Sequence, residues 1–409
     1  MIEFKYIEGG SVTSPLGFTA DGVCAGVKSS NTTKRDLALI CCEKKCNAAA
    51  IFTKNLVKSD TIYVTQKHLE NGTAQAVVVN SGNANACNPD GYEKAEQMCR
   101  LTAEALGIDE NDIIVASTGV IGQPLPIEPI EKGIASLKST LSKSGGTNAA
   151  EAIMTTDTVK KEWATTAVIG GKTVTIGGIA KGSGMIHINM GTTLSFVTTD
   201  AAISAEMLKE ALIEAADVSY NMVSVDGDTS TNDTLAIMAS GLAQNAEICE
   251  KNEDYKAFVL VLTDAFKRVA KKLAADGEGA TKLLICGVSG AKDEQTAKTV
   301  AKSIICSSLV KAAMFGADAN CGRILCAIGY SGAEADVKKI DVSYKSSKGE
   351  ILVCRDGNGL AFDENKAKEI LLESEIEIIV KLGDGNGCAE AYGCDLTYDY
   401  VKINGDYRT

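Results

Sequence analysis

The chain has 409 residues, 45% of them hydrophobic, and a formal net charge of −12. This composition is typical of a folded globular protein, and an acidic chain without a dense basic run argues against nucleic acid as a partner. The N-terminal residues lack the basic start and apolar run of a signal peptide. No apolar stretch reaches the roughly 18 residues that a membrane-spanning helix needs. We therefore expect a cytoplasmic protein, without membrane contact, that acts on small molecules.

The cysteines and histidines limit the chemistry further. The chain has 14 cysteines and only two histidines, His68 and His187. Without an export signal the thiols are expected to be reduced, and no CxxC pair indicates a metal site. Most of the cysteines lie in apolar runs and are interpreted as core residues. We therefore predict no bound metal, and the alternative left open is an iron–sulfur site built from ligands distant in sequence.

The apolar periodicity alternates between strand-like and helix-like segments, which predicts an α/β architecture. In chain order we expect a strand at Ala76–Asn80, a helix at Tyr92–Leu106, a strand at Ile113–Ala116, a hairpin of Thr165–Ile169 and Lys172–Ile176 around Gly170-Gly171, strand-like segments at Ile179–Ile188 and Thr193–Thr199, helices at Ala205–Ala216 and Tyr255–Ala275, a strand at Lys282–Val288, a helix at Thr296–Phe315, and strands at Ile351–Cys354 and Glu375–Lys381. No linker separates these segments, so we expect one body of two intimately packed halves.

The scarcity of histidine bears on the general base. A Ser-His-Asp or Cys-His system would need one of the two histidines. His68 lies in a predicted helix and is expected on its solvated face, and His187 is expected to be a hydrogen-bonded core residue. A terminal amine is another candidate base, because its unperturbed pKa of roughly 7.7 to 8.0 lies near working pH.

The segment Lys181–Thr199, KGSGMIHINMGTTLSFVTT, favours that candidate. It resembles the self-processing region of the glutamate N-acetyltransferase (ornithine acetyltransferase) family of arginine biosynthesis, in which a small residue precedes a threonine within a pattern such as KGSGMIxPNMATML. Further segments similar to the family occur along the whole chain. They are GGSVTSPLGFTADGVCAGVK, KRDLALI, VVVNSGNANAC, ASTGVIGQPLP, IMTTDT, SVDGDTSTNDT, EGATK, CGRILCAIGYSG and GCDLTYDYVKINGDYRT.

The resemblance implies that the Thr192 hydroxyl attacks the Gly191 carbonyl and cuts the chain into an α chain of residues 1–191 and a β chain of residues 192–409. Glycine before the bond permits the close approach that this step needs. The new α-amine of Thr192 would then serve as base for its own hydroxyl. Thr192 would carry acetyl from N-acetylornithine to glutamate, with Thr118 and Gly119 as the oxyanion hole.

The resemblance also implies a layered α/β fold with mixed sheets and a heterotetramer of two α and two β chains. No cofactor is expected. Some members of the family also accept acetyl-CoA as a donor, and the sequence leaves that use open.

Substrate contacts follow from the same resemblance. They are carried over to Thr158, Lys181, Thr192, Glu278, Asn404 and Thr409. Lys181 suits a carboxylate and Glu278 an ammonium group, while the threonine of MTTDT that contacts substrate stays open. Without the resemblance, Lys181 and Glu278 would be interpreted as surface charges, and Ser117-Thr118-Gly119 as a strand-ending turn.

This sequence departs from the usual family pattern at three positions. Ile188 stands where proline is common, Gly191 replaces alanine, and Thr193 replaces methionine. The doubled threonine leaves cleavage before Thr193 as an alternative, but Thr192 keeps the family's spacing from Lys181.

Two alternative functions are considered. An N-terminal-nucleophile amidohydrolase or aminopeptidase of similar fold would use water as the acyl acceptor. A redox protein built around its cysteines would remain uncut.

Overall fold

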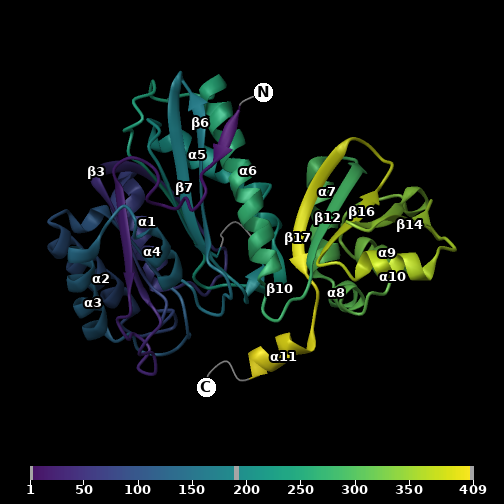
Figure 1. Ribbon diagram of the computed structural model, residues 1–409, viewed down its shortest axis with the longest axis horizontal. Helices are drawn as coiled ribbons and strands as arrows, with labels where there is room; N and C mark the ends of the chain where they lie inside the picture. The colour runs from purple at the N-terminus through teal and green to yellow at the C-terminus, as the bar shows by residue number, and fades with distance from the viewer. Residues whose placement is uncertain (1–2, 188–192, 406–409) are drawn as a thin grey trace. The chain divides into compact units, whose positions relative to one another are not determined.

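The computed structural model of the chain describes residues 3–187 and 193–405 (Figure 1). The chain forms two compact units. Unit 1 comprises Met1–Gly182, Ile188–Asp217 and Thr229–Val269, and unit 2 comprises Ser183–His187, Val218–Asp228 and Ala270–Thr409. Each unit therefore draws segments from both sides of the predicted junction at Gly191. Helix α6 (Glu253–Ala275) begins in unit 1 and ends in unit 2.

Unit 1 is built on a large mixed sheet with the strand order β1-β6-β7-β9-β11-β3-β4-β5, and β2 pairs with β3 beside this path. Its strands are β1 (Phe4–Tyr6), β2 (Phe18–Val23), β3 (Leu37–Phe52), β4 (Thr73–Asn80), β5 (Ile113–Ser117), β6 (Lys161–Ile169), β7 (Lys172–Lys181), β9 (Leu194–Thr199) and β11 (Thr234–Ala239). Its helices are α1 (Asp60–His68), α2 (Gly91–Leu106), α3 (Ile127–Thr140), α4 (Gly146–Ala152) and α5 (Ala205–Asp217).

Strand β5, the end of β4 and the start of β3 are buried on both faces, which explains why these parts of the sequence are almost continuously apolar. Successive residues point to opposite faces of a strand, so Leu39 and Val78 enter one core while Ile40 and Val77 enter another. Helices α2 and α3 contribute to the first of these cores. Each fully buried side chain of this size contributes roughly 1.5–3 kcal/mol.

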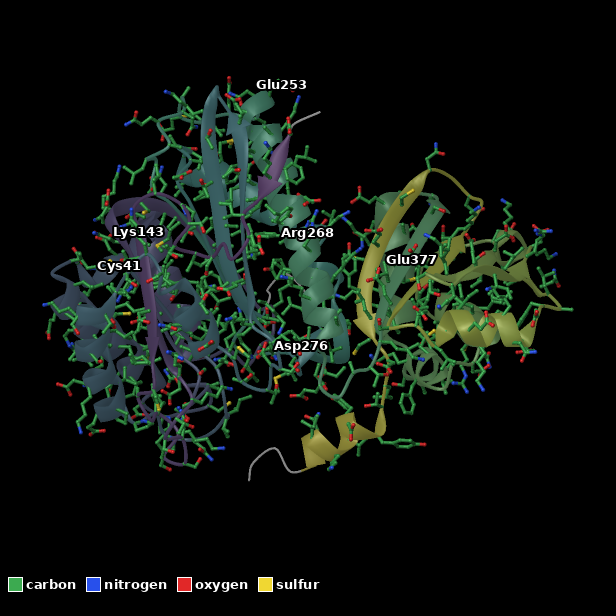
Figure 2. All side chains as sticks on the ribbon, in the orientation of Figure 1. Cys41, Lys143, Glu253, Arg268, Asp276 and Glu377 are labelled. Carbon is green, nitrogen blue, oxygen red and sulfur yellow. The ribbon has the colours of Figure 1, made fainter. Side chains whose placement is uncertain are left out.

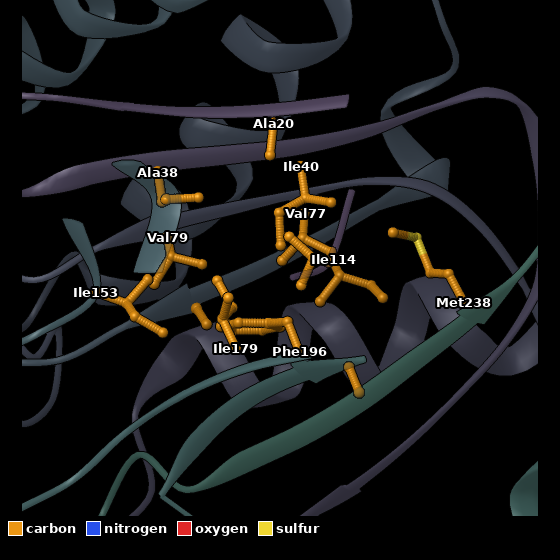
Figure 3. Close-up of a cluster of buried hydrophobic side chains, with 14 of the residues drawn as sticks. Ala20, Ala38, Ile40, Val77, Val79, Ile114, Ile153, Ile179, Phe196 and Met238 are labelled. Atoms are coloured by element: carbon orange, nitrogen blue, oxygen red, sulfur yellow. The ribbon is translucent and has the colours of Figure 1, made fainter. Parts of the chain in front are cut away.

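The second core lies between two parts of the same sheet. Figure 3 shows Ile40 and Val77 directed toward Ile179 and Phe196, which belong to β7 and β9. The long strand β3 makes this possible, because its first part pairs with β2 and β4 and its last part with β11. The pairing of β3 with β4 shifts register after Cys41, and such an irregularity lets a strand bend.

Unit 2 contains a mixed sheet in the order β15-β14-β13-β16-β12-β17 and a small pair of strands, β10 and β8. Its strands are β8 (Ile186–His187), β10 (Ser224–Thr229), β12 (Leu283–Ala291), β13 (Asp341–Ser346), β14 (Gly349–Arg355), β15 (Asn358–Gly359), β16 (Glu375–Lys381) and β17 (Gly387–Cys394). Its helices are α7 (Glu294–Cys306), α8 (Ser308–Phe315), α9 (Cys321–Gly329), α10 (Glu364–Leu371) and α11 (Tyr398–Gly405). Figure 1 shows α7 beside β12 and β17.

The predicted mixed α/β architecture is confirmed, and so is the hairpin. Gly170 and Gly171 both have positive φ between β6 and β7, as a tight turn of this kind requires. The single helix predicted over Thr296–Phe315 is wrong, because it divides into α7 and α8 at Ser307. The extended backbone of Ser307 ends α7, and its hydroxyl accepts a hydrogen bond from Val310 N and caps α8.

The prediction for His68 is also wrong. Its side chain is buried, and its Nδ1 lies 2.9 Å from the carbonyl oxygen of Ile113 in β5. The helix that carries it therefore uses this histidine to bind the neighbouring strand.

The interpretation of the cysteines as core residues holds only in part. Some are buried, namely Cys42, Cys46, Cys99, Cys286, Cys354 and Cys394, while Cys24, Cys87, Cys249, Cys326 and Cys388 are exposed. Within residues 3–187 and 193–405, no cluster of three or more potential metal ligands occurs. No helix in the same ranges is both long and apolar enough to cross a membrane.

Candidate active site

The turn after β5 carries Thr118 and Gly119. The backbone N–H of Thr118 donates to the carbonyl oxygen of Asn80 at 2.9 Å. Gly119 has a φ of +133°, and a Cβ atom there would lie 2.7 Å from the backbone nitrogen of Asn83. The turn thus requires glycine for its conformation and for this close approach.

Two buried asparagines hold the turn in place. Asn80 accepts hydrogen bonds from the backbone of Gly82 and Asn83, and its amide donates to the Ser117 hydroxyl at 2.6 Å. Asn232 lies in the loop before β11 and donates to the carbonyl oxygens of Ala84 and Ser117 at 2.6 and 2.7 Å. The turn is therefore fixed from the β4 side and from the β11 side.

Lys181 ends β7 and lies beside this turn. Its Nζ donates to the Thr118 hydroxyl at 3.2 Å, and the residue is only 9% exposed. The interpretation of Lys181 as a surface charge is therefore wrong. A cation and a hydroxyl from distant parts of the sequence meet in a buried part of unit 1.

A buried ion pair lies next to Lys181. Lys161 Nζ is 2.7 Å from Asp157 Oδ1, with both side chains fully buried. The same carboxylate accepts the backbone N–H of Gly182 at 2.6 Å. Burial alone would raise the pKa of Asp157, but the charges of Lys161 and Lys181 and these hydrogen bonds outweigh it and hold the pKa below its usual value. Asp157 is thus a buried anion hydrogen-bonded to the backbone of Gly182, the residue that follows Lys181.

Asp233 is a second buried carboxyl group close to Lys181. Burial raises the pKa of Asp233 to about 8, and the charge of Lys181 and a hydrogen bond with Ser230 offset only part of that effect. The group is therefore largely protonated at neutral pH, whereas Asp157 is ionised.

The MTTDT segment, predicted to bind substrate, surrounds Asp157. Thr158 is exposed, and the backbone N–H of Thr155 donates to Asp157 Oδ2 at 3.1 Å. The carbonyl oxygen of Thr155 accepts a hydrogen bond from Lys34 at 2.6 Å. The aspartate therefore organises the segment in which the predicted threonine lies.

Glu278 and Asn404 meet within unit 2. Glu278 is 7% exposed, and its carboxylate accepts a hydrogen bond from Asn404 Nδ2 at 2.8 Å. A Cβ atom at Gly184 would lie 2.2 Å from the same carboxylate, so only glycine fits there. The interpretation of Glu278 as a surface charge is wrong, and two of the predicted substrate-binding residues of this unit are in contact.

The prediction that His187 is hydrogen-bonded is confirmed, but the residue is only partly buried and not a core residue. Its Nδ1 lies 3.1 Å from the Ser224 hydroxyl and 3.5 Å from Cys306 Sγ. Burial, reinforced by the charge of Lys302, lowers the pKa of His187 to about 4. The ring is therefore neutral at physiological pH.

Several predicted residues fall outside the described residues. They are Ile188, Gly191, Thr192 and Thr409. Thr193, where the described chain resumes, is buried. The structure thus brings Lys181 together with Thr118 and Gly119 in unit 1, and Glu278 together with Asn404 in unit 2.

Comparison with known proteins shows the family of the chain. The model of the ArgJ family matches residues 19–409. The chain belongs to the ArgJ family. The arginine biosynthesis bifunctional protein ArgJ of Caldanaerobacter subterraneus is 51% identical over 98% of this chain and 99% of its own length. The protein of that name from Bacillus subtilis is 47% identical over 98% of this chain and 97% of its own length.

A solved structure is similar over part of the chain. The ornithine acetyltransferase of Mycobacterium tuberculosis, determined in complex with ornithine, is 37% identical and covers 46% of this chain and 99% of its own, with a TM-score of 0.43. Membership of the ArgJ family makes the chain an acetyltransferase of arginine biosynthesis.

Sequence reasoning missed the residues that support the site. Asp157, Asn232 and Asp233 all lie inside segments that resemble the family, IMTTDT and SVDGDTSTNDT, so a signal for them was present. Lys161 lies in a charged run, Lys160-Lys161-Glu162, that is typical of a surface, and only the structure shows that it is buried.

Proposed function

We propose that the chain transfers acetyl from N2-acetylornithine to glutamate through an acetyl ester on Thr192. The contact of Lys181 Nζ with the Thr118 hydroxyl at 3.2 Å carries this proposal. It joins two residues to which the family's resemblance assigns the oxyanion hole and a substrate contact. The relatives named as arginine biosynthesis proteins support the pathway.

We also propose that the chain cuts itself between Gly191 and Thr192. The Thr192 Oγ forms a bond to the Gly191 carbonyl carbon while the C–N bond breaks, and the hydroxyl proton passes to the departing nitrogen. Water then cleaves the resulting ester, leaving residues 1–191 and 192–409. The freed α-amine of Thr192 can act as base for its own hydroxyl during acetyl transfer.

The sheet of unit 1 supports a stable association of the two fragments. Strands β9 and β11 belong to the second fragment, and they lie between β7 and β3 of the first. Each is hydrogen-bonded to its neighbours along its length. Separation would therefore break the centre of the sheet, so we propose an α/β heterodimer, two of which form the tetramer.

The Thr118 hydroxyl suits the stabilisation of an oxyanion. A hydroxyl has one proton to donate and two lone pairs. Because Lys181 donates into a lone pair of Thr118, the proton of this hydroxyl remains for a developing negative charge. We assign the second donor to the backbone of Gly119, in the turn that Asn80 and Asn232 hold.

Substrate recognition is assigned by charge. By resemblance to the family, Lys181 of unit 1 is assigned to a substrate carboxylate and Glu278 of unit 2 to an ammonium group. Asn404 fixes the Glu278 carboxylate by its 2.8 Å hydrogen bond. Thr158 and Thr409 complete the set by resemblance to the family.

We propose that the enzyme works in the cytoplasm. We also propose that it needs no cofactor, because the threonine amine and hydroxyl supply the base and the nucleophile. The word bifunctional in the names of the relatives supports acetyl-CoA as a second donor. The coenzyme would then acetylate the same Thr192.

The test measures ornithine release from N-acetylornithine with and without glutamate. We expect release to depend on glutamate, and to disappear in Thr192→Ala while Thr193→Ala retains it. Equal release without glutamate would instead indicate a hydrolase. Formation of N-acetylglutamate from acetyl-CoA and glutamate tests the second donor.

A further inference from the structure

The segment Ser183–His187 leads to the predicted junction, and a carboxylate holds its backbone. The N–H groups of Met185 and Ile186 donate to the two oxygens of Asp226 at 2.7 and 2.9 Å. Hydrogen bonds from backbone N–H groups to an ionised carboxylate are short and strong. Asp226 therefore accepts hydrogen bonds from two successive peptide groups of this segment.

One of these hydrogen bonds is made by a residue with an unfavourable backbone conformation, Met185. Met185 has a φ of +54°, which costs a side-chain-bearing residue roughly 1–2 kcal/mol. Its side chain is about half exposed, so packing of the thioether offsets little of that cost. The hydrogen bonds of the Met185 and Ile186 N–H groups to Asp226 stabilise the backbone at this point.

Neighbouring contacts of unit 2 complete the support of the segment. The Ser183 hydroxyl donates to the carbonyl oxygen of Asp276, labelled in Figure 2 just after α6, at 2.7 Å. The backbone N–H of Glu278 donates to the carbonyl oxygen of Ser183 at 3.1 Å. Strand β8 pairs with β10, the strand that contains Asp226. The segment is thus held at both ends.

Asp226 also contacts the C-terminal helix. Tyr400 belongs to α11, which carries Asn404, and burial together with the nearby charge of Asp226 raises the pKa of the Tyr400 hydroxyl. The exposed Asp228 donates its backbone N–H to Asp226 at 3.2 Å. These two residues provide matched controls. Both lie next to Asp226, but the hydrogen bonds from the Met185 and Ile186 N–H groups are accepted by Asp226 itself.

We propose that Asp226 is a positioning residue for self-cleavage, which acts by fixing the backbone of Met185 and Ile186, shortly before the predicted junction in the sequence. Gly191 follows Ile186 by only five positions. An intramolecular attack depends steeply on the geometry of the reacting atoms, so an error in the approach of the chain slows it. This inference rests on the self-cleavage proposed above.

The test follows cleavage of freshly synthesised precursor by denaturing mass spectrometry over time. We compare the wild type with Asp226→Asn, Asp226→Ala, Asp228→Asn and Tyr400→Phe. Cleavage should slow roughly tenfold or more in Asp226→Ala, which loses both charge-assisted acceptors, and less in Asp226→Asn, which keeps one acceptor oxygen. Asp228→Asn and Tyr400→Phe should cleave at the wild-type rate.

The controls separate positioning from general damage. Asp226→Asn should retain the thermal midpoint of the uncut Thr192→Ala protein when the two changes are combined. Wild-type cleavage rates in both Asp226 variants would overturn the inference while leaving self-cleavage intact. Equal slowing in Tyr400→Phe would also overturn it, by assigning the effect to α11. A wild-type chain that never cleaves would overturn the proposed self-cleavage and this inference with it.

Discussion

At the scale of single residues, the site is defined by which charges are buried together. Lys181 donates to the Thr118 hydroxyl, and its charge also acts on Asp157 and Asp233. Asp157 already has Lys161 as its ion-pair partner, and Asp233 is largely protonated at neutral pH. The Lys181 ammonium group thus lies beside one ionised and one largely protonated carboxyl group in a buried part of unit 1.

Replacement of Lys181 tests this role. Lys181→Met removes the donor to Thr118 and the cation, and we expect acetyl transfer to fall about a hundredfold or more. Lys172→Met is the matched control, because Lys172 is an exposed lysine at the opposite end of the same strand. Steady-state rates with N-acetylornithine and glutamate provide the measurement. A normal rate in Lys181→Met would contradict the assignment.

The raised pKa of Asp233 predicts a pH dependence of stability. Its folded-state pKa of about 8 lies above the ordinary unfolded value, so its contribution is fully present below that ordinary value and is lost as pH rises to about 8. Asp233→Asn mimics the protonated acid, so the free energy of unfolding of this variant should decline less as pH rises than that of the wild type. Denaturant unfolding of both proteins between acidic and mildly alkaline pH checks it. An unchanged difference in unfolding free energy across the range would show that Asp233 does not titrate in this way.

At the scale of elements, the loop before β11 fixes the turn after β5. Asn232 makes two hydrogen bonds to buried carbonyl oxygens, one of them on Ser117, directly before Thr118. The turn's own sequence contains little that would hold it, since Gly119 lacks a side chain. The position of the proposed oxyanion donors thus depends on a segment more than a hundred residues away in the chain.

Asn232→Ala is expected to act on both stability and rate. Loss of the amide leaves carbonyl oxygens of Ala84 and Ser117 without this donor, which should cost at least about 2 kcal/mol of unfolding free energy. The rate of acetyl transfer at saturating substrate should also fall, because Thr118 loses its support. Asn111→Ala, in an exposed turn, is the control and should change neither quantity. A stability loss with an unchanged rate would limit Asn232 to a structural role.

The sequence predicted regular elements well where one period dominates. Strands β4 and β5 and helix α2 follow from apolar runs and three- and four-residue spacing. The division of α7 from α8 was missed because the apolar spacing continues past Ser307, whose capping role appears only in its backbone conformation. Burial of His68 was missed because its partner, Ile113, is distant in sequence. Burial of Lys161 was missed because the charged run Lys160-Lys161-Glu162 is typical of a surface.

At the scale of the whole molecule, the predicted cut divides the sheet of unit 1 between two fragments. Strands β9 and β11 would come from residues 192–409 and their neighbours β7 and β3 from residues 1–191. Neither fragment contains a complete copy of this sheet. The resemblance predicted the cut, but the interleaving of strands follows from the topology alone.

This interleaving predicts that the fragments cannot part without unfolding. After cleavage both should elute together on size exclusion in native buffer and separate only in denaturant. Refolding should succeed with the fragments mixed and fail with either one alone, because each lacks central strands of the sheet. Recovery of a folded single fragment would contradict the topology.

The most direct test of the account is denaturing intact mass spectrometry of the purified protein, before and after addition of N-acetylornithine. We predict two fragments separated after Gly191, with one acetyl group added to the fragment that begins at Thr192, and a single uncut chain in Thr192→Ala. Thr193→Ala should cleave and accept acetyl as the wild type does. An uncut wild-type chain, a break before Thr193, or acetyl on any residue other than Thr192 would contradict the proposed mechanism.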